Sequence, residues 1–457
     1  MLSPKPCPCH AAHAAPHPAL GALPWLVLAV SVATTGCGGG DEKDMQSDEG
    51  AAEDGGTDGP TTALTWHQDV APIFARSCAG CHDGGGAGAG IDLTTAAGAQ
   101  AWAPAIAVEV GARRMPPWTA AEDCTDYIGD FSLSAEDRAA VVAWASGGAP
   151  LGDPATAAPL PAAYEPPRLD RVDLQLQLPV DYAPNPSQPD DYRCFLVDWP
   201  WAEDAWVTGT DIRPTNVAIA HHVITFLIPP EEVATYEALD AADPDPGYPC
   251  YGGPGGDIDS LQRMKWLGAW APGGGASVFP EGAGLLVRPG SKLVQQMHYN
   301  TLGGGGTDRT VMDLRVETTP QEWADIQPWT DVRWVLGVGM QIPANTQGVS
   351  HEFRYRAGAG DRFAFHTAAL HMHTMGVSAR MHVEHADGGQ SCLVAEDSWD
   401  FNWQRTYALA NPVNIAPGDE IVLRCTWDND SDQDAAWGEG TGDEMCLATT
   451  LITQPVP

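Results

Sequence analysis

The sequence predicts a mainly β protein in which two tandem antiparallel β-sandwiches follow a small all-α domain. Glycine and proline are abundant, at 50 and 39 residues, and long helical patterns are scarce, which indicates many short strands joined by turns. Short apolar runs alternate with Gly, Pro and Asp turns, as in β-sandwiches, at residues 218–228, 292–299, 362–370, 377–383 and 420–426. The β region, about 285 residues, is too long for one sandwich. A break near residues 318–326 divides it into sandwiches at 169–318 and 319–457.

The charge balance limits the partners of the chain. Lys and Arg together number 23 and Asp and Glu number 60, which gives a formal net charge of −37. An acidic protein is repelled by nucleic acid and by anionic membrane surfaces, so we expect no nucleic-acid partner. Apolar residues make up 44% of the chain, which excludes disorder throughout.

Residues 1–37 have the pattern of an export signal. Lys5 precedes an apolar run at residues 20–33, which is too short for a stable membrane-spanning helix. The run ends in small residues before Cys37 and resembles a bacterial lipobox, although Thr34 stands where leucine is usual. This pattern predicts a protein exported to the periplasm or cell envelope of a Gram-negative bacterium and anchored to a membrane by a lipid on Cys37. Secretion with a free Cys37 is the alternative.

Two segments of biased composition separate the expected domains. Residues 38–63 are acidic and glycine-rich, which predicts a flexible, disordered tether between the anchor and the folded chain. Residues 151–168 are rich in proline and alanine, which predicts a semi-rigid linker without secondary structure. The segment between them, residues 64–150, is the expected all-α domain.

The all-α domain contains a C-x-x-C-H motif at Cys78, Cys81 and His82. This motif is the attachment signature of a c-type haem, because two thiols bond the porphyrin edge and the adjacent imidazole reaches the iron. Apolar spacing over residues 66–76 predicts a helix that leads into the motif, and a capping box at Ser134 predicts a second helix. Together these elements resemble a small class I cytochrome c. A plain disulfide or a partial zinc site is the alternative.

Met115 is the candidate for the second axial ligand of this haem. It is the one methionine in the domain and is followed by Pro116 and Pro117, as in the distal-ligand loop of many small cytochromes c. Thioether ligation raises the reduction potential of a haem. The alternative is that Met115 only packs in the core.

Five histidines of the β region lie in three apolar contexts. His371 and His373 are two residues apart, so in a strand they face the same side and together could hold one ion. His221 and His222 are adjacent and point to opposite faces of a regular strand. If both bind one metal, the strand must end or bulge there. His298 follows in a third apolar run.

Four short motifs then occur in a recognisable order along the chain. They are His-His-Val at 221–223, Gln-x-His-Tyr at 296–299, His-x-His at 371–373 and Asp-Glu-Met-Cys at 443–446. The combination resembles the copper type II, ascorbate-dependent monooxygenases, which include peptidylglycine α-hydroxylating and dopamine β-monooxygenases. The similarity covers roughly residues 172–454. It implies an enzyme that hydroxylates a C–H bond with O₂ and uses two electrons per turnover.

The resemblance implies two copper ions with separate roles. An electron-transfer copper in the first sandwich would be bound by His221, His222 and His298. A catalytic copper in the second sandwich would be bound by His371, His373 and Met445. Two imidazoles and a thioether suit Cu(I). Three imidazoles are also a fair zinc site, so the assignment of copper depends on the resemblance and on Met445.

In an exported protein the remaining cysteines are expected to form disulfides. Cys446 directly follows the proposed methionine ligand, and a bond to Cys425 would hold that ligand in place. The resemblance implies another disulfide within the first sandwich. Elimination then leaves two cysteines, whose bond would join the cytochrome domain to the second sandwich. The expected pairs are Cys425–Cys446, Cys194–Cys250 and Cys124–Cys392.

Three positions depart from the pattern of the peptide-hydroxylating members. Ala369 stands where those members have an arginine that holds the substrate carboxylate, and Leu447 and Thr449 replace an asparagine and a tyrosine. A glycine-extended peptide is therefore not expected as the substrate. Gln296 is expected to support His298. The other histidines of the β region match no ligand position and are expected to be structural: His351, His366, His382 and His385.

These inferences predict a copper monooxygenase whose electrons arrive through the fused haem. Its partners would be a small organic substrate, O₂, an electron donor such as an ascorbate-like reductant or a redox protein, and a membrane. We expect the haem to supply the copper of the first sandwich, since tethering raises the effective concentration of the donor. The alternatives are a non-catalytic copper and haem protein, for storage, sensing or electron relay, and a zinc-binding sandwich adhesin.

Overall fold

The computed structural model describes most of the chain from Ala63 onward, and contacts join residues 62–457 into one compact unit. The described residues are 63–84, 90–162, 167–188, 190–250, 253–256, 264–271, 274–301, 304–319, 321–401, 403–438 and 442–454. The predicted export signal, Cys37 and nearly all of the predicted tether lie outside them. Within these ranges no helix has the length and apolar character needed to cross a membrane.

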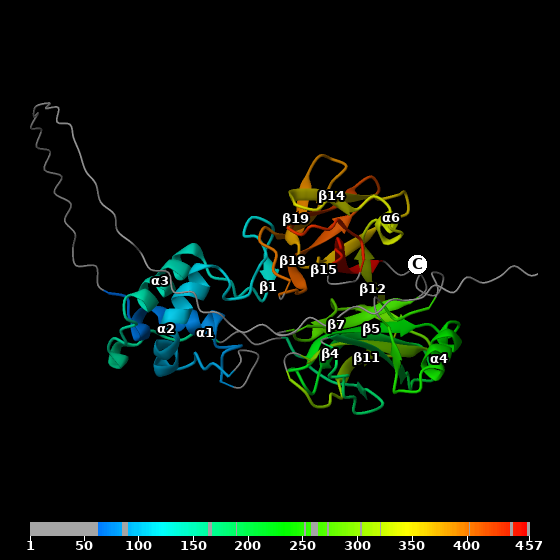
Figure 1. Cartoon of the computed structure of the whole chain (residues 1–457), viewed down its shortest axis with the longest axis horizontal. Helices are drawn as coiled ribbons and strands as arrows, with labels where there is room; N and C mark the ends of the chain where they lie inside the picture. Colours follow the sequence, from blue (N-terminus) through cyan, green and yellow to red (C-terminus); the bar gives the residue numbers. More distant parts are fainter. Residues whose placement is uncertain are drawn as a thin grey trace, which may run out of the picture. The chain divides into compact units, whose positions relative to one another are not determined.

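Helices form the first described part of the chain (Figure 1). They are the π-helical turn η1 (Trp66–Val70), α1 (Ala71–Ser77), α2 (Ala96–Gly111) and α3 (Ala135–Ser146). The helix predicted before the C-x-x-C-H motif is confirmed by η1 and α1. The capping box is confirmed as well, because the Ser134 hydroxyl accepts a hydrogen bond from the Asp137 amide at 3.0 Å. Rings of Trp66, Phe74 and Trp144 pack edge to face or tilted at centroid distances of 5.0 to 5.7 Å and form the centre of this core.

The first part of the predicted linker is ordered against these helices. The His67 amide donates to the Leu151 carbonyl at 3.0 Å, and the Ala158 amide donates to the His67 carbonyl at 2.8 Å. Between them, η2 (Pro154–Thr156) is a 3-10 turn capped by Asp153. The expectation of a linker without secondary structure is therefore wrong for these residues, because backbone hydrogen bonds to the first helical turn hold them.

The β region begins with a set of mostly antiparallel strands, as predicted. Their bounds are β2 Leu174–Gln177, β3 Asp190–Asp198, β4 Ala205–Arg213, β5 Ala220–Ile228, β6 Tyr248–Pro249, β7 Lys265–Trp270, β8 Ser277–Val278, β9 Ala283–Val287, β10 Lys292–Asn300 and β11 Val311–Glu317. Strands β7, β5, β10, β3 and β6 are neighbours in that order, while β4 pairs with β8, β9 and β11. The helix α4 (Val233–Ala242) lies between β5 and β6 in sequence.

The second set of strands forms the rest of the β region. Their bounds are β12 Glu322–Trp329, β13 Gln341–Ile342, β14 Thr346–Arg356, β15 Phe363–His371, β16 Gly376–Glu384, β17 Gln390–Glu396, β18 Tyr407–Ile415, β19 Glu420–Asn429, β20 Ala435–Ala436 and β21 Leu447–Gln454. Strands β18, β15, β21 and β12 are neighbours, and β14, β19, β16 and β17 form a separate antiparallel sheet. A short helix, α6 (Val332–Val335), follows β12. The five apolar runs singled out in the sequence are confirmed as β5, β10, β15, β16 and β19.

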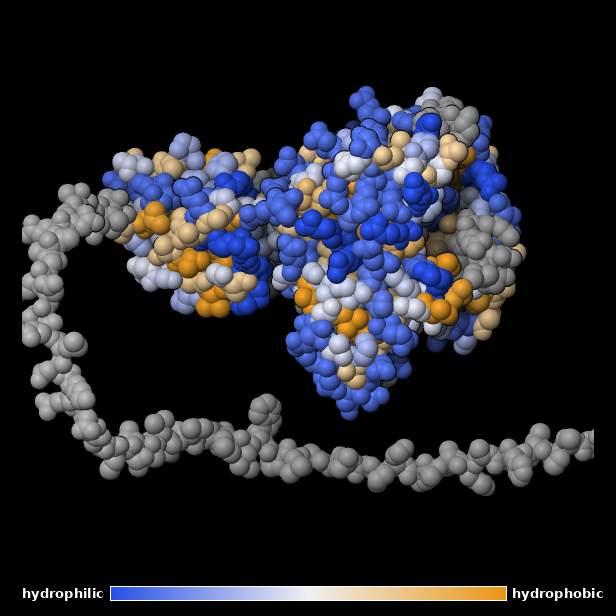
Figure 2. Space-filling model, turned by 90° about the horizontal axis from the view of Figure 1, so that it is seen from above, coloured by the Kyte–Doolittle hydropathy of each residue, from blue (hydrophilic) through white to orange (hydrophobic). Residues whose placement is uncertain are grey.

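Two hydrophobic cores meet at β12. Ala324 belongs to the core of the preceding strands, and Trp329 belongs to the core of the following strands. β12 also pairs with both sets, since Ile326 lies opposite Trp266 of β7 and opposite Leu451 of β21. The change of core thus falls between Ala324 and Trp329, inside a strand that the two sets share. On the face shown in Figure 2 the surface is mostly hydrophilic with scattered apolar patches, in keeping with the strongly acidic composition.

The loop between Met115 and Phe131 belongs to the second core rather than to the helices alone. Residues Tyr127–Ile128 form β1, which pairs with β18. Ala120 and Tyr127 are buried in the core of the second strand set. Cys124 is bonded to Cys392 of β17. The helical domain is therefore attached to the β region by a strand pair and a disulfide.

Candidate metal centres

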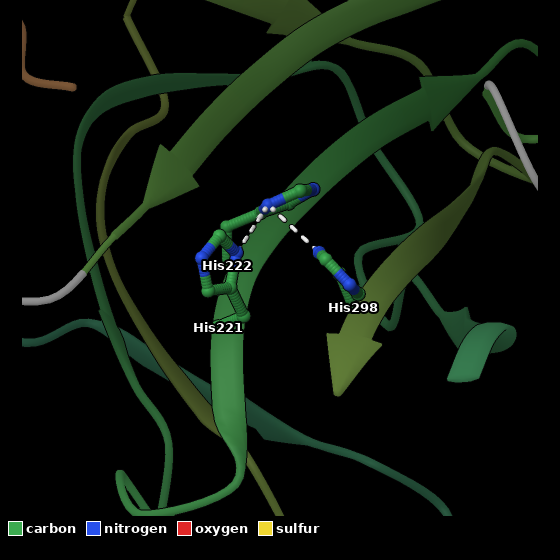
Figure 3. Close-up of side chains that lie close together, drawn as sticks. All are labelled: His221, His222 and His298. Carbon is green, nitrogen blue, oxygen red and sulfur yellow. Dashed lines mark hydrogen bonds between the residues drawn. The ribbon is translucent and has the colours of Figure 1, made fainter. Parts of the chain in front are cut away.

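His221, His222 and His298 come together where β5 and β10 lie side by side (Figure 3). The Nδ1 atom of His222 lies 3.4 Å from the Nδ1 atom of His221 and 3.4 Å from that of His298. One ligand atom from each of the three side chains falls within 4.8 Å of the others. Three imidazole nitrogens that converge in this way can bind one metal ion.

A β-bulge brings the two adjacent histidines to the same side. His298 lies opposite His222, whereas the next residue of β10, Tyr299, lies opposite Ala220. His221 is thus the extra residue of the bulged strand, and its side chain is turned from the face it would have in a regular strand. The sequence-based expectation that the strand must end or bulge at this pair is confirmed.

Surrounding groups orient these rings and keep them neutral. The Nε2 atom of His298 lies 2.9 Å from Oδ1 of Asp190, a carboxylate that can only accept, so Nε2 carries the proton and Nδ1 faces the other rings. Tyr192 stacks on His298 with centroids 4.0 Å apart. Burial lowers the pKa of His298 to about 4 and holds the pKa of His222 well below its usual range. Neutral imidazole is the form that binds metals.

Asp190 was missed in the sequence, and Gln296 has a different role from the one expected. Asp190 begins β3 and lies opposite Asn300, two residues after His298, so only the strand pairing reveals it. The Gln296 amide donates to the carbonyl oxygens of Cys250 at 2.8 Å and Gly253 at 3.3 Å. It therefore supports the loop of the Cys194–Cys250 disulfide, and Asp190 is the residue that supports His298.

His371 and His373 lie at and just after the end of β15, with ring centroids 5.3 Å apart. Nδ1 of His371 donates to Oε1 of Gln404 at 2.5 Å, and Nδ1 of His373 donates to the carbonyl of Asp443 at 3.0 Å. Both acceptors are oxygen atoms, so each ring keeps its Nε2 atom available for a metal. Burial, with a further contribution from His373, lowers the pKa of His371 to about 4.

Met445 lies just before the strand that pairs with the strand of His371. His371 lies opposite Leu447 in the last pair of β15 with β21, and Met445 precedes Leu447 by two residues. Both neighbours of Met445 are held: Cys446 is bonded to Cys425, and the buried carboxylate of Glu444 binds the segment of His373. Met445 itself is half-buried.

One side chain contacts both histidine groups. The ring of Phe401 lies 6.3 Å from the ring of His221 and 6.3 Å from the ring of His373. A charge on His371 also contributes to lowering the pKa of His222. The two groups predicted from separate parts of the sequence are thus close enough to interact electrostatically.

The C-x-x-C-H motif follows α1, and its residues differ from the other cysteines of the described chain. The cysteines of the β region and Cys124 form all three expected disulfides, whereas Cys78 and Cys81 are not bonded to each other or to another thiol. Burial raises the pKa of Cys78 to about 12. Cys78 and Met115 both pack against the core of the helices. The thiols of Cys78 and Cys81, directly before His82, thus form no disulfide in the described part of the chain.

The remaining histidines of the β region have structural partners, as expected. His351 pairs with the Gln341 carbonyl and His366 with the Thr453 hydroxyl, while His382 lies 3.5 Å from the Glu384 carboxylate. His385 joins Ser391 to Asp419, whose carboxylate also accepts from the amides of Ala386 and Ala416. These bonds hold the hairpin between β16 and β17.

Comparison with known proteins supports the copper resemblance. Residues 342–450 match the C-terminal domain of copper type II ascorbate-dependent monooxygenases. This range contains three of the predicted ligands, His371, His373 and Met445. The match confirms the predicted resemblance over this part of the chain.

Longer similarities extend to curated relatives. The chain is 28% identical over 272 residues to peptidyl-glycine alpha-amidating monooxygenase A of Xenopus laevis, which covers 57% of this chain and 26% of that protein. It is 23% identical over 284 residues to DBH-like monooxygenase protein 1 of Gallus gallus, covering 59% and 45%. An 80-residue stretch is 39% identical to DBH-like monooxygenase protein 2 of Mus musculus, covering 17% and 13%. The matched region therefore spans less than half the length of each of these relatives.

A likeness to a solved structure is weaker. A peptide-N(4)-(N-acetyl-β-D-glucosaminyl) asparagine amidase aligns with 62% of this chain and 97% of its own, with a TM-score of 0.28 and 8% identity. Similarity at this level carries no argument about function. The sequence relatives, by contrast, support the predicted monooxygenase.

Proposed function

We propose that the chain is a copper-dependent monooxygenase that hydroxylates a C–H bond of an organic substrate with O₂. The convergence of His221, His222 and His298 at the β5 bulge carries this proposal, because a bulge that turns two adjacent half-buried histidines toward a third, buried one has a direct use in metal binding. Copper bound there and at the second group would supply one-electron redox chemistry and activate O₂. The family match at residues 342–450 supports the same conclusion.

The two groups would hold copper with different donor sets. His221, His222 and His298 offer three neutral imidazoles, a set that also suits zinc. His371, His373 and Met445 add a thioether, which favours Cu(I) over zinc. Asp190 and Gln404 would fix which ring nitrogen faces the metal in each group, since each binds the other nitrogen of a ligand ring.

A c-type haem would be held by the helical domain. Cys78 and Cys81 would bond the porphyrin, His82 would be one axial ligand and Met115 the other. A haem attached in this way would supply single electrons to the copper centres. The packing of Met115 and Cys78 on one core supports the assignment.

The substrate is proposed to lack a carboxylate that must be held near the second group. His371, Ala369, Leu447 and Thr449 form two directly opposed pairs of β15 and β21, so their side chains share one face of the sheet. A methyl group, an isobutyl group and a hydroxyl group would thus share the face of the sheet on which His371 would hold the catalytic copper. These groups suit a neutral and largely apolar molecule.

The cellular location is proposed from the N-terminal pattern and the disulfides. Export to the periplasm or cell envelope, with a lipid on Cys37, would place the protein where disulfides form. The three disulfides of the β region and its attached loop support such a compartment. Mass spectrometry of the mature N-terminus tests the lipid anchor.

Metal content per chain is the first test of this function. Protein matured in a periplasm with copper present should contain one covalent haem iron and two copper ions, and it should consume O₂ when given ascorbate. Zinc in place of copper would contradict the proposal. Two tightly bound copper ions without any O₂ consumption would favour the rival, a copper and haem protein without catalytic activity.

A further inference from the structure

The segment between β17 and β18 contacts both the helical domain and the histidine groups. At one end, Phe401 lies against His221 and His373. Three residues on, Gln404 accepts the hydrogen bond from Nδ1 of His371 at 2.5 Å. The next residue, Arg405, contacts the loop that follows Met115. One short stretch of chain therefore joins the two predicted redox modules.

Arg405 contacts two rings of the loop that follows Met115. Its guanidinium carbon lies 4.7 Å from the ring centroid of Phe131 and 5.1 Å from that of Trp118, which are cation–π distances. Trp118 follows the proposed axial ligand Met115 by three residues, and its amide donates to the Pro116 carbonyl at 2.8 Å. Arg405 is thus in contact with the loop that carries Met115.

Gln404 contacts the copper side. When the ring nitrogen that does not bind the metal makes a hydrogen bond, the imidazole is fixed in orientation and its other nitrogen becomes a stronger metal ligand. The Gln404 amide nitrogen also donates to the Phe401 carbonyl at 2.9 Å, which ties the two ends of the segment together. The contact of this segment with the first histidine group is the ring of Phe401 against His221.

We propose that Gln404 and Arg405 form the route by which an electron passes from the haem at Cys78 and Cys81 to the copper at His371 and His373. This inference rests on the proposed function and changes one part of it, since the sequence led us to expect transfer to the copper of the first sandwich. Gln404 bonds a ligand of the second group directly, whereas the first group is reached through a ring contact. Gln404 and Arg405 are positioning residues in this role.

The step balances as a one-electron transfer. Ferrous haem iron is oxidised to ferric iron, and one cupric ion is reduced to the cuprous state, with no bond made or broken. An external one-electron donor, either an ascorbate-like reductant or a redox protein, then reduces the haem again. The second electron of each turnover arrives in the same way.

Flash reduction of the haem in the full-length oxidised protein, without O₂ or substrate, tests this route. A photo-excited flavin delivers one electron to the haem, and the decay of the reduced haem band is followed while electron paramagnetic resonance measures cupric copper. Haem and copper contents are measured first for every protein. We expect a decay in the wild type whose rate does not depend on protein concentration, with loss of cupric signal.

Ligand variants identify which copper receives the electron. Replacing His371 and His373 with alanine should abolish the decay, and replacing His221 and His298 should leave it. The reverse pattern would overturn the proposal in favour of the first histidine group. A wild type that holds haem and both coppers but shows no decay would also overturn the route, while leaving copper binding intact. A wild type without haem or copper would instead contradict the proposed function itself.

Variants of the segment test the two residues directly. Gln404→Leu should slow the decay by about 10-fold or more, the size of effect that follows when an outer partner of a metal ligand is lost. Arg405→Leu should slow the decay as well. Arg405→Lys keeps the charge but not the planar stack and should recover only part of the rate. Gln347→Leu, at an exposed position of β14, is the matched control. Wild-type decay in Gln404→Leu with full haem and copper would refute the role of Gln404.

Discussion

The buried carboxylate of Glu444 accepts a hydrogen bond from the backbone amide of His373 at 2.8 Å. It also accepts from the Met375 amide at 2.6 Å and from the Trp427 indole at 2.9 Å. Glu444 immediately precedes Met445, so this side chain links the segment of the histidine ligands to the segment of the methionine ligand. Because this carboxylate accepts three hydrogen bonds, it fixes the position of the His373 segment relative to Met445.

Glu444→Gln should therefore weaken both folding and the second copper site. The amide group of glutamine places a donor against a backbone amide, which leaves a buried polar group without a partner and costs about 1–3 kcal/mol in the free energy of unfolding. Urea unfolding and the copper content per chain measure the two effects. Glu322→Gln, at an exposed position, is the control. Unchanged stability with two copper ions would contradict the role assigned to Glu444.

Asp190→Asn should weaken metal binding at the first group without changing the fold. Asparagine no longer offers a charged acceptor to His298 Nε2, and loss of such a partner lowers metal affinity by about 10- to 100-fold. Competition with a copper chelator measures the affinity. Asp198→Asn, at the other end of β3 in an exposed ion pair with Lys292, is the matched control. Equal affinity in both variants would show that Asp190 does not support the ligand.

The sequence predicted the strands, and the histidines that the structure brings together, because their signals are local. Apolar runs between turns mark β5, β10, β15, β16 and β19, and adjacent histidines in a strand require a bulge for a shared metal. Helix α2 was missed for a physical reason. Its sixteen residues are rich in alanine, include Pro104 and show no amphipathic pattern of hydropathy. The sequence therefore contains no apolar periodicity from which this helix could be predicted.

Contacts between distant segments could not be predicted in the same way. Asp190 and His298 are 108 residues apart and meet only through the pairing of β3 with β10. Likewise, the packing of the loop after Met115 onto the second core depends on β1 joining β18, and two residues give no strand signal. The Cys124–Cys392 bond was expected by elimination, and the bridge between Ala120 and Glu396 of β17 shows why the two cysteines are close.

Met115→Leu should remove the sulfur-to-iron absorption band of the oxidised haem while covalent attachment at Cys78 and Cys81 remains. Leucine fills nearly the same volume as methionine, so core packing is kept and the loss of a band reports the ligand. Visible absorption spectra and the mass of the haem-bound chain measure the outcome. Met264→Leu, in a partly buried position of the β region, is the control. A band that persists in Met115→Leu would reject Met115 as the axial ligand.

Ionisation of Glu396 should lower the free energy of unfolding as the pH rises. Burial, with a smaller contribution from Asp400, raises the pKa of Glu396 from 4.5 to about 7 at the place where Thr119 packs on the second core. The folded state therefore holds a proton that the unfolded chain releases, so the stabilisation is complete below pH 4.5 and is lost between there and about pH 7.

The full shift corresponds to at most about 3 kcal/mol in the free energy of unfolding. Urea unfolding at a series of pH values should show that fall in the wild type, and Glu396→Gln, which stays neutral, should remove most of it. Parallel curves for the two proteins would contradict the assignment, because the pH dependence would then come from other groups.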